Sequence, residues 1–350
     1  MGSSSLRKMA KTATNLEGQI ATFVMPHWSE GGEQSERHLR EAVASVLAQT
    51  DPRWRLVIID DGSPAASIHE SMRVLQAERP EQIELIFRPE REGPGAARNI
   101  GVERAVALGS PFVLFLDADD LAGERRLEVA RRIFEENPLA SVVYTTFHVI
   151  DERSKPVAET SLTPSIQEIL ESHRSQPPQG PDAWIEIGTR TGYSNLTSAT
   201  SVRTDLAHRI PFPCEFVSED SHTWMRYGAG GDHFVFAAES PTLYRIPLGA
   251  QGSSSRSRDG GRSGFYRAKA RVDHDGFSRA IELAVEKGKI MRSQAADLMF
   301  RFHLKLGETL EKEGELELAA DQFRKALRIS RDPRSSGRLD PDGRVLRSWR

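Results

Sequence analysis

The sequence of residues 112–120 is FVLFLDADD. Its first five residues are all large and apolar, a pattern typical of a strand that is buried on both faces. The apolar run ends abruptly at three carboxylates, Asp117, Asp119 and Asp120. Burying such groups without a partner costs several kcal/mol, so they need a cation, a hydrogen-bond donor or water. The stretch therefore predicts a core strand that ends in a polar, chemically active segment.

The residues around this strand alternate between apolar runs and helical patterns. Strands are predicted at 20–25, 55–60, 83–88, 112–116 and 141–149, and helices at 38–48, 68–77, 96–107 and 125–136. This alternation predicts βαβ units, and hence an α/β fold with a mainly parallel sheet and flanking helices on both faces. Ligands of such sheets bind outside the carboxyl ends of the strands, so polar residues at those ends are the candidates for function.

The spacing of Asp117 and Asp119 indicates a cation site. Side chains at positions i and i+2 of an extended segment point the same way, so both carboxylates can approach one hard divalent cation. An acidic loop, or a helix start capped by Asp119 or Asp120, explains the same residues. The residues alone leave both interpretations open.

A second apolar run ends in paired acids at residues 56–64, LVIIDDGSP. An acid at this strand end can accept hydrogen bonds from a nucleobase or a ribose. A helix cap formed by Asp61 or Ser63 is an equal alternative.

Two further segments carry polar groups at predicted helix starts. GPGAARNIG at 93–101 is a glycine-rich entry to a helix, where free N–H groups and Arg98 can meet a phosphate. SEDSHTWMR at 218–226 sets Glu219 and Asp220 before a helix, and either carboxylate could act as a general base. An acidic pair favoured by the helix dipole is the alternative for the second segment.

Composition divides the chain into six parts. These are a disordered tail at 1–18, an α/β part at 19–150, a second part at 151–248, a flexible loop at 249–264, a helical appendage at 265–332 and a disordered tail at 333–350. A polar, Pro-rich stretch at 172–182 is predicted to connect into the second part. The loop at 249–264 contains too many Gly, Ser and Arg residues to pack.

Within the appendage, residues 303–333 resemble one tetratricopeptide-type helical hairpin. Residues close to that repeat's positions are Leu306, Gly307, Leu310, Ala319, Phe323, Ala326 and Pro333. A lone repeat cannot form a solenoid, so we expect a hairpin that packs on the α/β part or on a second copy in a homodimer.

Overall composition excludes several classes of partner. The formal net charge of −3 gives no electrostatic case for nucleic acid or a membrane surface. Cys214 is the single cysteine, which excludes an internal disulfide framework and fits a reducing compartment. Neither a signal peptide nor a membrane span is apparent, so we predict a cytoplasmic protein.

Five segments taken in order resemble the family 2 glycosyltransferases of the GT-A fold. They are MPHWS, REAVASVLAQTDPRWRLVIIDDGSP, GPGAARNIG, FLDADDL and SEDSHTWMR, and the resemblance spans about residues 20–244. It implies that residues 19–150 bind a nucleotide sugar and that residues 151–248 bind the acceptor and hold the base. The implied reaction transfers a sugar from a nucleotide-diphosphate donor to an acceptor hydroxyl, with inversion and with Mg²⁺ or Mn²⁺ as the cofactor.

The resemblance also implies roles on the donor side. Pro26 and Trp28 match the end of the first strand, where the family usually has an aromatic residue against the nucleobase. Asp61 matches the acid that reads the base, which suits uracil, so UDP is the expected carrier while GDP and dTDP stay open. Arg98 matches an arginine near the diphosphate.

The family's metal motif and base have counterparts here as well. Asp117 and Asp119 match the DxD motif, with Asp119 the direct metal ligand and Asp117 nearer to the ribose or to a metal-bound water. Asp220 matches the catalytic base, with Glu219 as its neighbour.

The chain departs from the family at two positions. Many relatives have a histidine that completes the metal site after a tyrosine-arginine pair, but LYRIPLGAQ at 243–251 has none. The QxxRW motif of processive synthases is also absent, which favours transfer of a single sugar. We expect the loop at 249–264 to close over the donor diphosphate, with a plain surface linker as the alternative.

Two other functions fit parts of the sequence. A sugar-phosphate nucleotidyltransferase also uses an α/β sheet and a metal-bound carboxylate, but that class opens with a glycine-rich GxGxRL-type loop where this chain has MPHWSEGGEQSER. A non-enzymatic scaffold that binds partners through the helical hairpin would not need the acids at 61, 117, 119 and 220.

Overall fold

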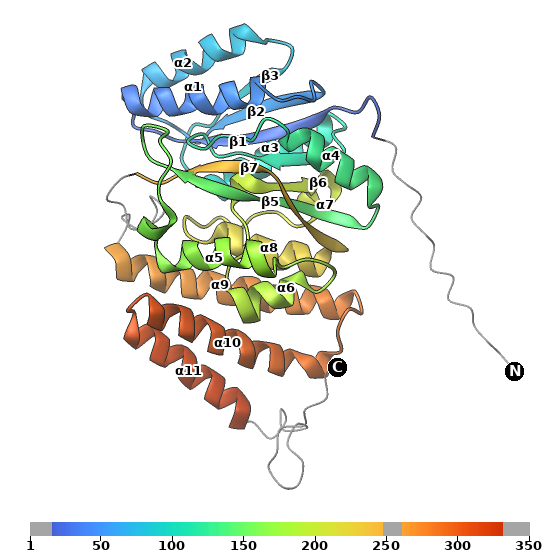
Figure 1. Ribbon diagram of the computed structural model, residues 1–350, viewed down its shortest axis with the longest axis vertical. Coiled ribbons are helices and arrows are strands. Elements are labelled where there is room, and N and C mark those ends of the chain that lie inside the picture. Colours follow the sequence, from blue (N-terminus) through green and yellow to red (C-terminus); the bar gives the residue numbers. More distant parts are fainter. Residues whose placement is uncertain (1–15, 248–260, 332–350) are drawn as a thin grey trace, which may run out of the picture.

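The computed structural model describes residues 16–247 and 261–331. Seven strands of these residues form one sheet in the order β3-β2-β1-β4-β6-β5-β7 (Figure 1). Their bounds are β1 Ala21–His27, β2 Trp54–Asp60, β3 Ile83–Phe87, β4 Phe112–Phe115, β5 Ala140–Ile150, β6 Thr200–Arg203 and β7 His233–Arg245. Only β6 runs antiparallel to its neighbours, β4 and β5. The predicted α/β class and mainly parallel sheet are confirmed.

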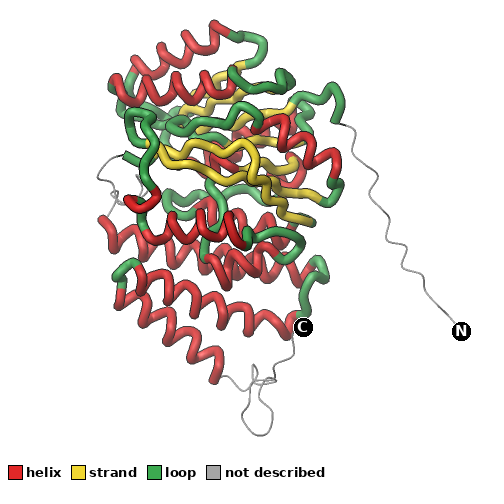
Figure 2. Tube along the Cα trace, viewed as in Figure 1, coloured by secondary structure: helices red, strands yellow, loops and turns green. Residues whose placement is uncertain are grey.

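Helices cover both faces of this sheet (Figure 2). Their bounds are α1 Glu33–Leu47, α2 Ala66–Glu78, α3 Pro94–Ala107, α4 Arg126–Glu136, α5 Pro164–Ser175, α6 Ala183–Glu186, α7 Thr204–Arg209, α8 Glu219–Gly230, α9 Gly261–Glu286, α10 Ala295–Lys312 and α11 Leu316–Arg331. A π-helical turn, η2, spans Ile187–Thr191 and follows α6 directly. The strands and helices predicted up to residue 150 all exist.

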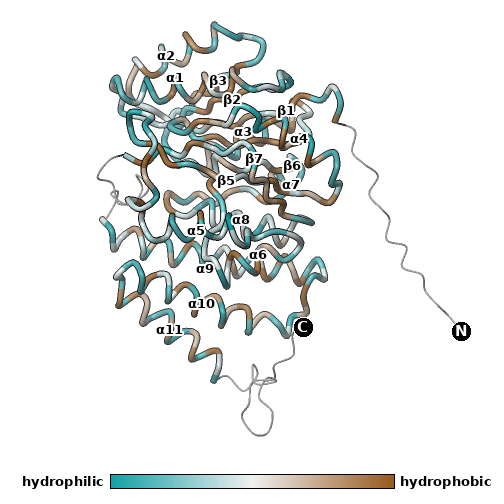
Figure 3. Tube along the Cα trace, in the orientation of Figure 1, coloured by the Kyte–Doolittle hydropathy of each residue, from teal (hydrophilic) through white to brown (hydrophobic). Residues whose placement is uncertain are grey.

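Alternation of side chains along the strands divides the hydrophobic core in two. On β1, Phe23 and Met25 belong to a cluster shared with α1, α2 and α4. Val24, between them, belongs to the cluster on the opposite face, which α3, α7 and α8 cover. Figure 3 shows the hydrophobic colouring concentrated on the strands, whereas the outer helices alternate between hydrophobic and hydrophilic residues. This pattern follows from the period of two in a pleated strand.

The C-terminal hairpin is part of the second core cluster. Leu306 and Leu310 of α10 are buried there together with residues of α8 and α9. The hairpin itself is tight, because a Cβ at Gly307 would lie 2.5 Å from the ring of Phe323 on α11. In Figure 1 the hairpin forms the end of the molecule farthest from α2. The predicted helical hairpin is present and packs on the rest of its own chain.

Three predicted boundaries are wrong. Leu16 is fully buried and its carbonyl accepts a hydrogen bond from Arg131, so the ordered chain begins before residue 19. Helix α9 begins at Gly261, so the last four residues of the predicted loop at 249–264 are helical. Helix α5 continues to Ser175, into the predicted connector. The remaining residues of that loop, at 249–260, and the tails at 1–15 and 333–350 lie outside the described residues.

The division at residue 150 does not separate two sheets, because β6 and β7 of the second part join the sheet of the first part. β6 lies between β4 and β5, so the later segment completes the core of the earlier one. Among the described residues, no helix is long and apolar enough to cross a membrane.

Candidate active site

A cleft of about 620 Å³ opens at the carboxyl ends of β1, β2 and β4. The first turns of α3 and α8 also line this cleft. All the residues that the sequence nominates for function line this cleft, namely Pro26, Trp28, Asp61, Arg98, Asp117, Asp119, Glu219 and Asp220. The structure thus brings together residues that are up to 194 positions apart in the sequence. Parallel strands that end at one edge make this convergence possible.

Asp117 and Asp119 follow β4 as the sequence predicts. The Asp117 backbone N–H donates to the Ser198 hydroxyl at 2.9 Å, which anchors the turn after the strand. Asp119 is exposed to solvent inside the cleft, although the cleft walls surround it. This enclosure and the neighbouring Asp117 carboxylate raise the pKa of Asp119 above its ordinary value. A cation between the two carboxylates would relieve their repulsion.

Asp120 does not cap the following helix but holds the end of β7. Its Oδ1 accepts the backbone N–H of Arg245 at 2.8 Å, and α4 has no side-chain cap. Burial and the adjacent Asp119 raise the pKa of Asp120 well above its ordinary value. The Arg245 guanidinium donates to the Asp119 carbonyl at 2.6 Å and to Glu41 of α1 at 2.7 Å. Arg245 therefore supports the acidic turn.

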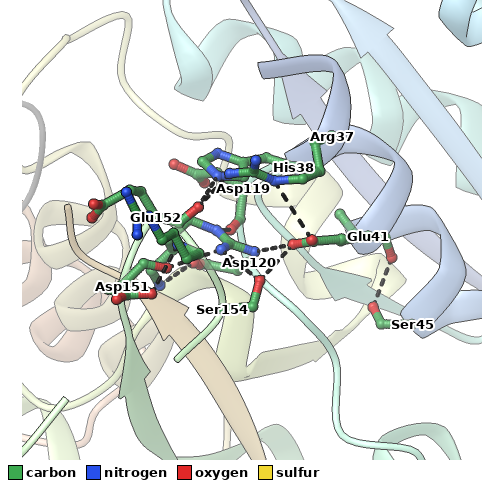
Figure 4. Close-up of polar contacts among 12 residues, drawn as sticks. Arg37, His38, Glu41, Ser45, Asp119, Asp120, Asp151, Glu152 and Ser154 are labelled. Atoms are coloured by element: carbon green, nitrogen blue, oxygen red, sulfur yellow. Dashed lines mark hydrogen bonds and ion pairs between the residues drawn. The ribbon is translucent and has the colours of Figure 1, made fainter. Parts of the chain in front are cut away.

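Helix α1 braces the same corner of the cleft (Figure 4). Glu152 lies just beyond the end of β5, and its carbonyl oxygen accepts a hydrogen bond from the Arg37 guanidinium at 2.6 Å. His38 Nε2 lies 2.9 Å from the same oxygen. Ser154 donates to Glu41 at 2.7 Å. The turn that carries Asp119 and Asp120 is thus enclosed by α1, the end of β5 and the end of β7.

Arg98 bridges the two acidic segments of the cleft. Its guanidinium donates to Asp117 Oδ1 and to Glu219 Oε1, each at 2.7 Å. Arg98 itself is 2% exposed. Burial alone would lower the pKa of Arg98, but the two carboxylates raise it, so the guanidinium is charged. Its partners are side chains, whereas the sequence predicts a diphosphate contact.

Glu219 and Asp220 open α8 and differ in their surroundings. Burial and the nearby Asp220 raise the pKa of Glu219 to about 7, against the opposing effect of Arg98. Asp220 Oδ2 accepts the hydroxyl of Tyr193, and its Oδ1 accepts the Ser221 N–H at 2.7 Å. Burial also raises the pKa of Asp220, while these hydrogen bonds oppose the shift. Asp220 is therefore a partly buried carboxylate held in a fixed orientation.

Asp61 is already engaged by the protein. Its Oδ1 accepts Arg88 and the Glu92 N–H, and its Oδ2 accepts the Gly93 N–H at 2.7 Å. Gly93 is the residue before α3. Asp61 therefore caps neither α2 nor α3 and instead fixes the turn that leads into α3. A further donor can still reach Oδ2, because a carboxylate oxygen accepts two hydrogen bonds.

The ring of Trp28 has a cation on one face. The Arg91 guanidinium carbon lies 3.5 Å from the Trp28 ring centroid and 5.5 Å from that of Phe216. Phe216 in turn packs on Gly93, where a Cβ would lie 3.2 Å from its ring. A base that stacks on this side of the cleft would therefore meet a layer of arginine and aromatic rings.

The donor set at Asp117 and Asp119 fits a hard divalent cation. Carboxylate oxygens are the ligands that Mg²⁺ and Mn²⁺ prefer. Within residues 16–247 and 261–331, no group of three or more His, Cys, Asp or Glu side chains is arranged to hold a metal ion. A cation here would take its remaining ligands from substrate phosphates and water, which is the usual arrangement for Mg²⁺.

Sequence reasoning missed the residues that orient the acids. Tyr193 binds Asp220, and Lys269 of α9 lines the same cleft. Neither lies in a recognisable motif, and Lys269 is 49 positions after Asp220 in the chain. Arg245 could have been predicted from the sequence, because it belongs to the tyrosine-arginine pair that follows the acceptor region in the family 2 glycosyltransferases.

Comparisons with known proteins agree with this architecture. The sequence model described as Glycosyl transferase family 2 matches residues 22–195. The succinoglycan biosynthesis protein ExoW of Rhizobium meliloti is 35% identical over 160 residues, which cover 43% of this chain and 48% of that protein. The chain matches less than half of the length of the first curated relatives, which include glycosyltransferases of Rickettsia and Haemophilus influenzae.

Solved structures share the fold at low sequence identity. S. aureus TarS in complex with UDP-GlcNAc has a TM-score of 0.51 and 17% identity, over 89% of this chain and 91% of that chain. The mannosyltransferase PcManGT of Pyrobaculum calidifontis, in complex with GDP-Man and Mn²⁺, has a TM-score of 0.52 and 15% identity, over 90% and 88%. The matched family model and the order of the motifs lead to one conclusion: residues 22–195 of the chain are a family 2 glycosyltransferase domain.

Proposed function

We propose that this protein transfers a single sugar from a nucleotide-diphosphate donor to an acceptor hydroxyl, with inversion at the anomeric carbon. The observation that carries the proposal is the convergence of an acidic strand end and an acidic helix start in one cleft, with Arg98 between them. A single in-line displacement needs a base on one side of the anomeric carbon and charge stabilisation on the other. Asp220 and the Asp117–Asp119 turn supply these two groups.

The donor is proposed to lie toward Trp28 and Asp61. The N3–H of a uracil is a donor that fits the remaining acceptor position on Asp61 Oδ2, which supports UDP as the carrier. Arg91 on the Trp28 ring adds a cation to this side. The same fold holds UDP-GlcNAc in TarS and GDP-Man in PcManGT, so the carrier is a proposal to be tested with a panel.

The acceptor is proposed to enter on the other side of Asp220. A chain of contacts runs from Asp117 through Arg98 and Glu219 to Asp220 and Tyr193. Asp220 therefore lies between the donor side of the cleft and the wall beyond Tyr193. An acceptor hydroxyl on the Tyr193 side can give its proton to Asp220 as the new bond forms.

The chain's own residues set up this proton transfer. Tyr193 and the Ser221 N–H fix the Asp220 carboxylate, and Arg98 fixes Asp117 relative to Glu219. Mg²⁺ or Mn²⁺, when bound to Asp119 and Asp117, would neutralise the negative charge of the departing diphosphate. No covalent nucleophile is required.

Release of nucleotide diphosphate from UDP-, GDP- and dTDP-sugars, with Mn²⁺ or EDTA, tests the proposal. We expect Mn²⁺-dependent release from at least one donor, and Asp220→Asn should slow it on the order of 10²-fold or more while leaving donor affinity unchanged. Glu215→Gln, on the loop before α8, is the matched control. Wild-type turnover in Asp220→Asn would exclude Asp220 as the base, and release of pyrophosphate from a nucleoside triphosphate and a sugar phosphate would instead indicate a nucleotidyltransferase.

A further inference from the structure

Ser218, directly before the two acids of α8, has an unusual backbone conformation. Its φ of 61° and ψ of 18° lie in the left-handed region, which a serine adopts only where its surroundings hold it. The direction in which Glu219 and Asp220 leave the loop depends on this conformation. What holds Ser218 therefore also orients the acids.

Two residues of α9 hold the Ser218 side chain. The Ser218 hydroxyl donates to Asp273 Oδ1 at 2.6 Å. Lys269, one turn earlier on the same helix, donates to Asp273 Oδ2 at 2.6 Å and lies 3.4 Å from the Ser218 hydroxyl. Asp273 is 3% exposed, and the Lys269 side chain is 14% exposed and reaches the cleft. The three side chains form one closed network.

Helix α9 cannot shift easily relative to the first turn of α8. A Cβ at Gly276 would lie 2.7 Å from the Cα of His222, so the two helix backbones are in direct contact. The His222 ring also lies 2.9 Å from Asp275 Oδ2. The network around Ser218 is thus built on a rigid base, because backbone contact leaves no room for sliding.

We infer that Lys269 and Asp273 are positioning residues, which hold Ser218 in its left-handed conformation and so direct the Asp220 carboxylate at the acceptor hydroxyl. This inference rests on the proposed role of Asp220 as the base. It makes the C-terminal helical region part of the catalytic apparatus rather than an appendage. The positive charge of Lys269 also acts on the Asp220 carboxylate. The other titratable or charged neighbours of Asp220 are Tyr193, Glu219 and Arg98.

Substitution of Lys269 by methionine separates this role from simple packing. Methionine keeps the apolar stem but removes the charge that favours the ionised form of Asp220. We expect Lys269→Met to lower kcat on the order of tenfold near neutral pH and to move the acidic limb of the kcat–pH profile to higher pH. Arg267→Met removes a charge from the exposed face of α9 and should leave both unchanged.

Substitution of Ser218 tests the conformational part of the inference. Ser218→Ala loses the hydrogen bond and keeps the strain, so kcat should fall on the order of 10²-fold with little change in donor affinity. Ser218→Gly should recover part of that loss, because glycine adopts the left-handed conformation without strain. Calorimetry of donor binding and thermal unfolding of each variant serve as the folding controls. If Ser218→Ala does not fold, the inference is tested with Lys269→Met alone.

The outcomes distinguish this inference from the proposed function. If Asp220→Asn is impaired but Lys269→Met and Ser218→Ala keep wild-type kcat and pH profile, the positioning role is wrong and Asp220 stands. If Asp220→Asn turns over normally, the base is elsewhere and the proposed function fails first. The inference is supported if kcat falls in both Lys269→Met and Ser218→Ala, and if the acidic limb of the kcat–pH profile shifts in Lys269→Met only.

Discussion

The Asp119 carboxylate is exposed in the cleft, where the charges of His38 and Arg245 oppose the rise of its pKa. Because its removal deletes a charge and no packing, we expect Asp119→Ala to lower Mn²⁺-dependent donor affinity by at least about tenfold. The free energy of unfolding should change by no more than about 0.5 kcal/mol. Calorimetry with donor and Mn²⁺ measures the first quantity, and Glu124→Ala is the control for loss of an exposed acid. Unchanged affinity would remove Asp119 from the metal site.

Glu219 makes the stability of the protein depend on pH. Its pKa in the folded protein is about 7, against an ordinary value of 4.5. Between these values the folded state keeps a proton that the unfolded state releases, so ionisation favours unfolding as the pH rises. Below pH 4.5 the group is protonated in both states and has no effect.

Denaturant unfolding of the wild type and Glu219→Gln over a series of pH values tests this consequence. We expect the stability of the wild type relative to Glu219→Gln to fall between pH 4.5 and about 7, by at most about 1.4 kcal/mol per pH unit. The difference should be constant above that window. A difference that rises with pH would mean that Arg98 keeps Glu219 ionised throughout.

Among the helices, α8 and α9 are in direct backbone contact at Gly276. Gly276 leaves no space for a methyl group beside His222, so Gly276→Ala must push the two helices apart. We expect the free energy of unfolding to fall by about 1–3 kcal/mol, the usual cost of overpacking. Urea denaturation measures it, with Glu282→Ala on the exposed face of α9 as the control. A stability equal to that of the control would show that α9 is free to move.

The elements that sequence patterns predicted are those with strong local signals. β2 and β4 are uninterrupted apolar runs, and both were predicted to within two residues. Helix α1 begins five residues earlier than predicted, because residues 33–37 are polar and give no apolar period. β6 has four residues and pairs antiparallel between two distant strands, so no local pattern could predict it.

The same distinction applies to the candidate site. Asp61, Asp117 and Asp119 follow apolar strands, and that position in the chain predicts that they meet at one edge of the sheet. Their partners are set by tertiary packing. Arg88 donates a hydrogen bond to Asp61, and Tyr193 donates one to Asp220. No spacing in the sequence encodes these two contacts.

At the scale of the whole molecule, the C-terminal helices complete the structure. Phe302 of α10 stacks on Phe277 of α9 with ring centroids 4.9 Å apart, and Phe277 packs against Gly188 of η2. The chain from η2 leads directly to Tyr193 and so to Asp220. The fold of the sheet, the orientation of the acids and the packing of the last helices are therefore parts of one arrangement.

The central claim is that Asp220 and the Asp117–Asp119 turn carry out a single displacement at the anomeric carbon. Proton NMR of the sugar first released from an α-linked nucleotide sugar, with Mn²⁺ and water as the acceptor, tests it most directly. One displacement predicts that the β-anomer appears first, before mutarotation mixes the two forms, and that Asp220→Asn abolishes its early excess. Initial release of the α-anomer would contradict the account, because retention requires a second displacement or a different geometry of attack.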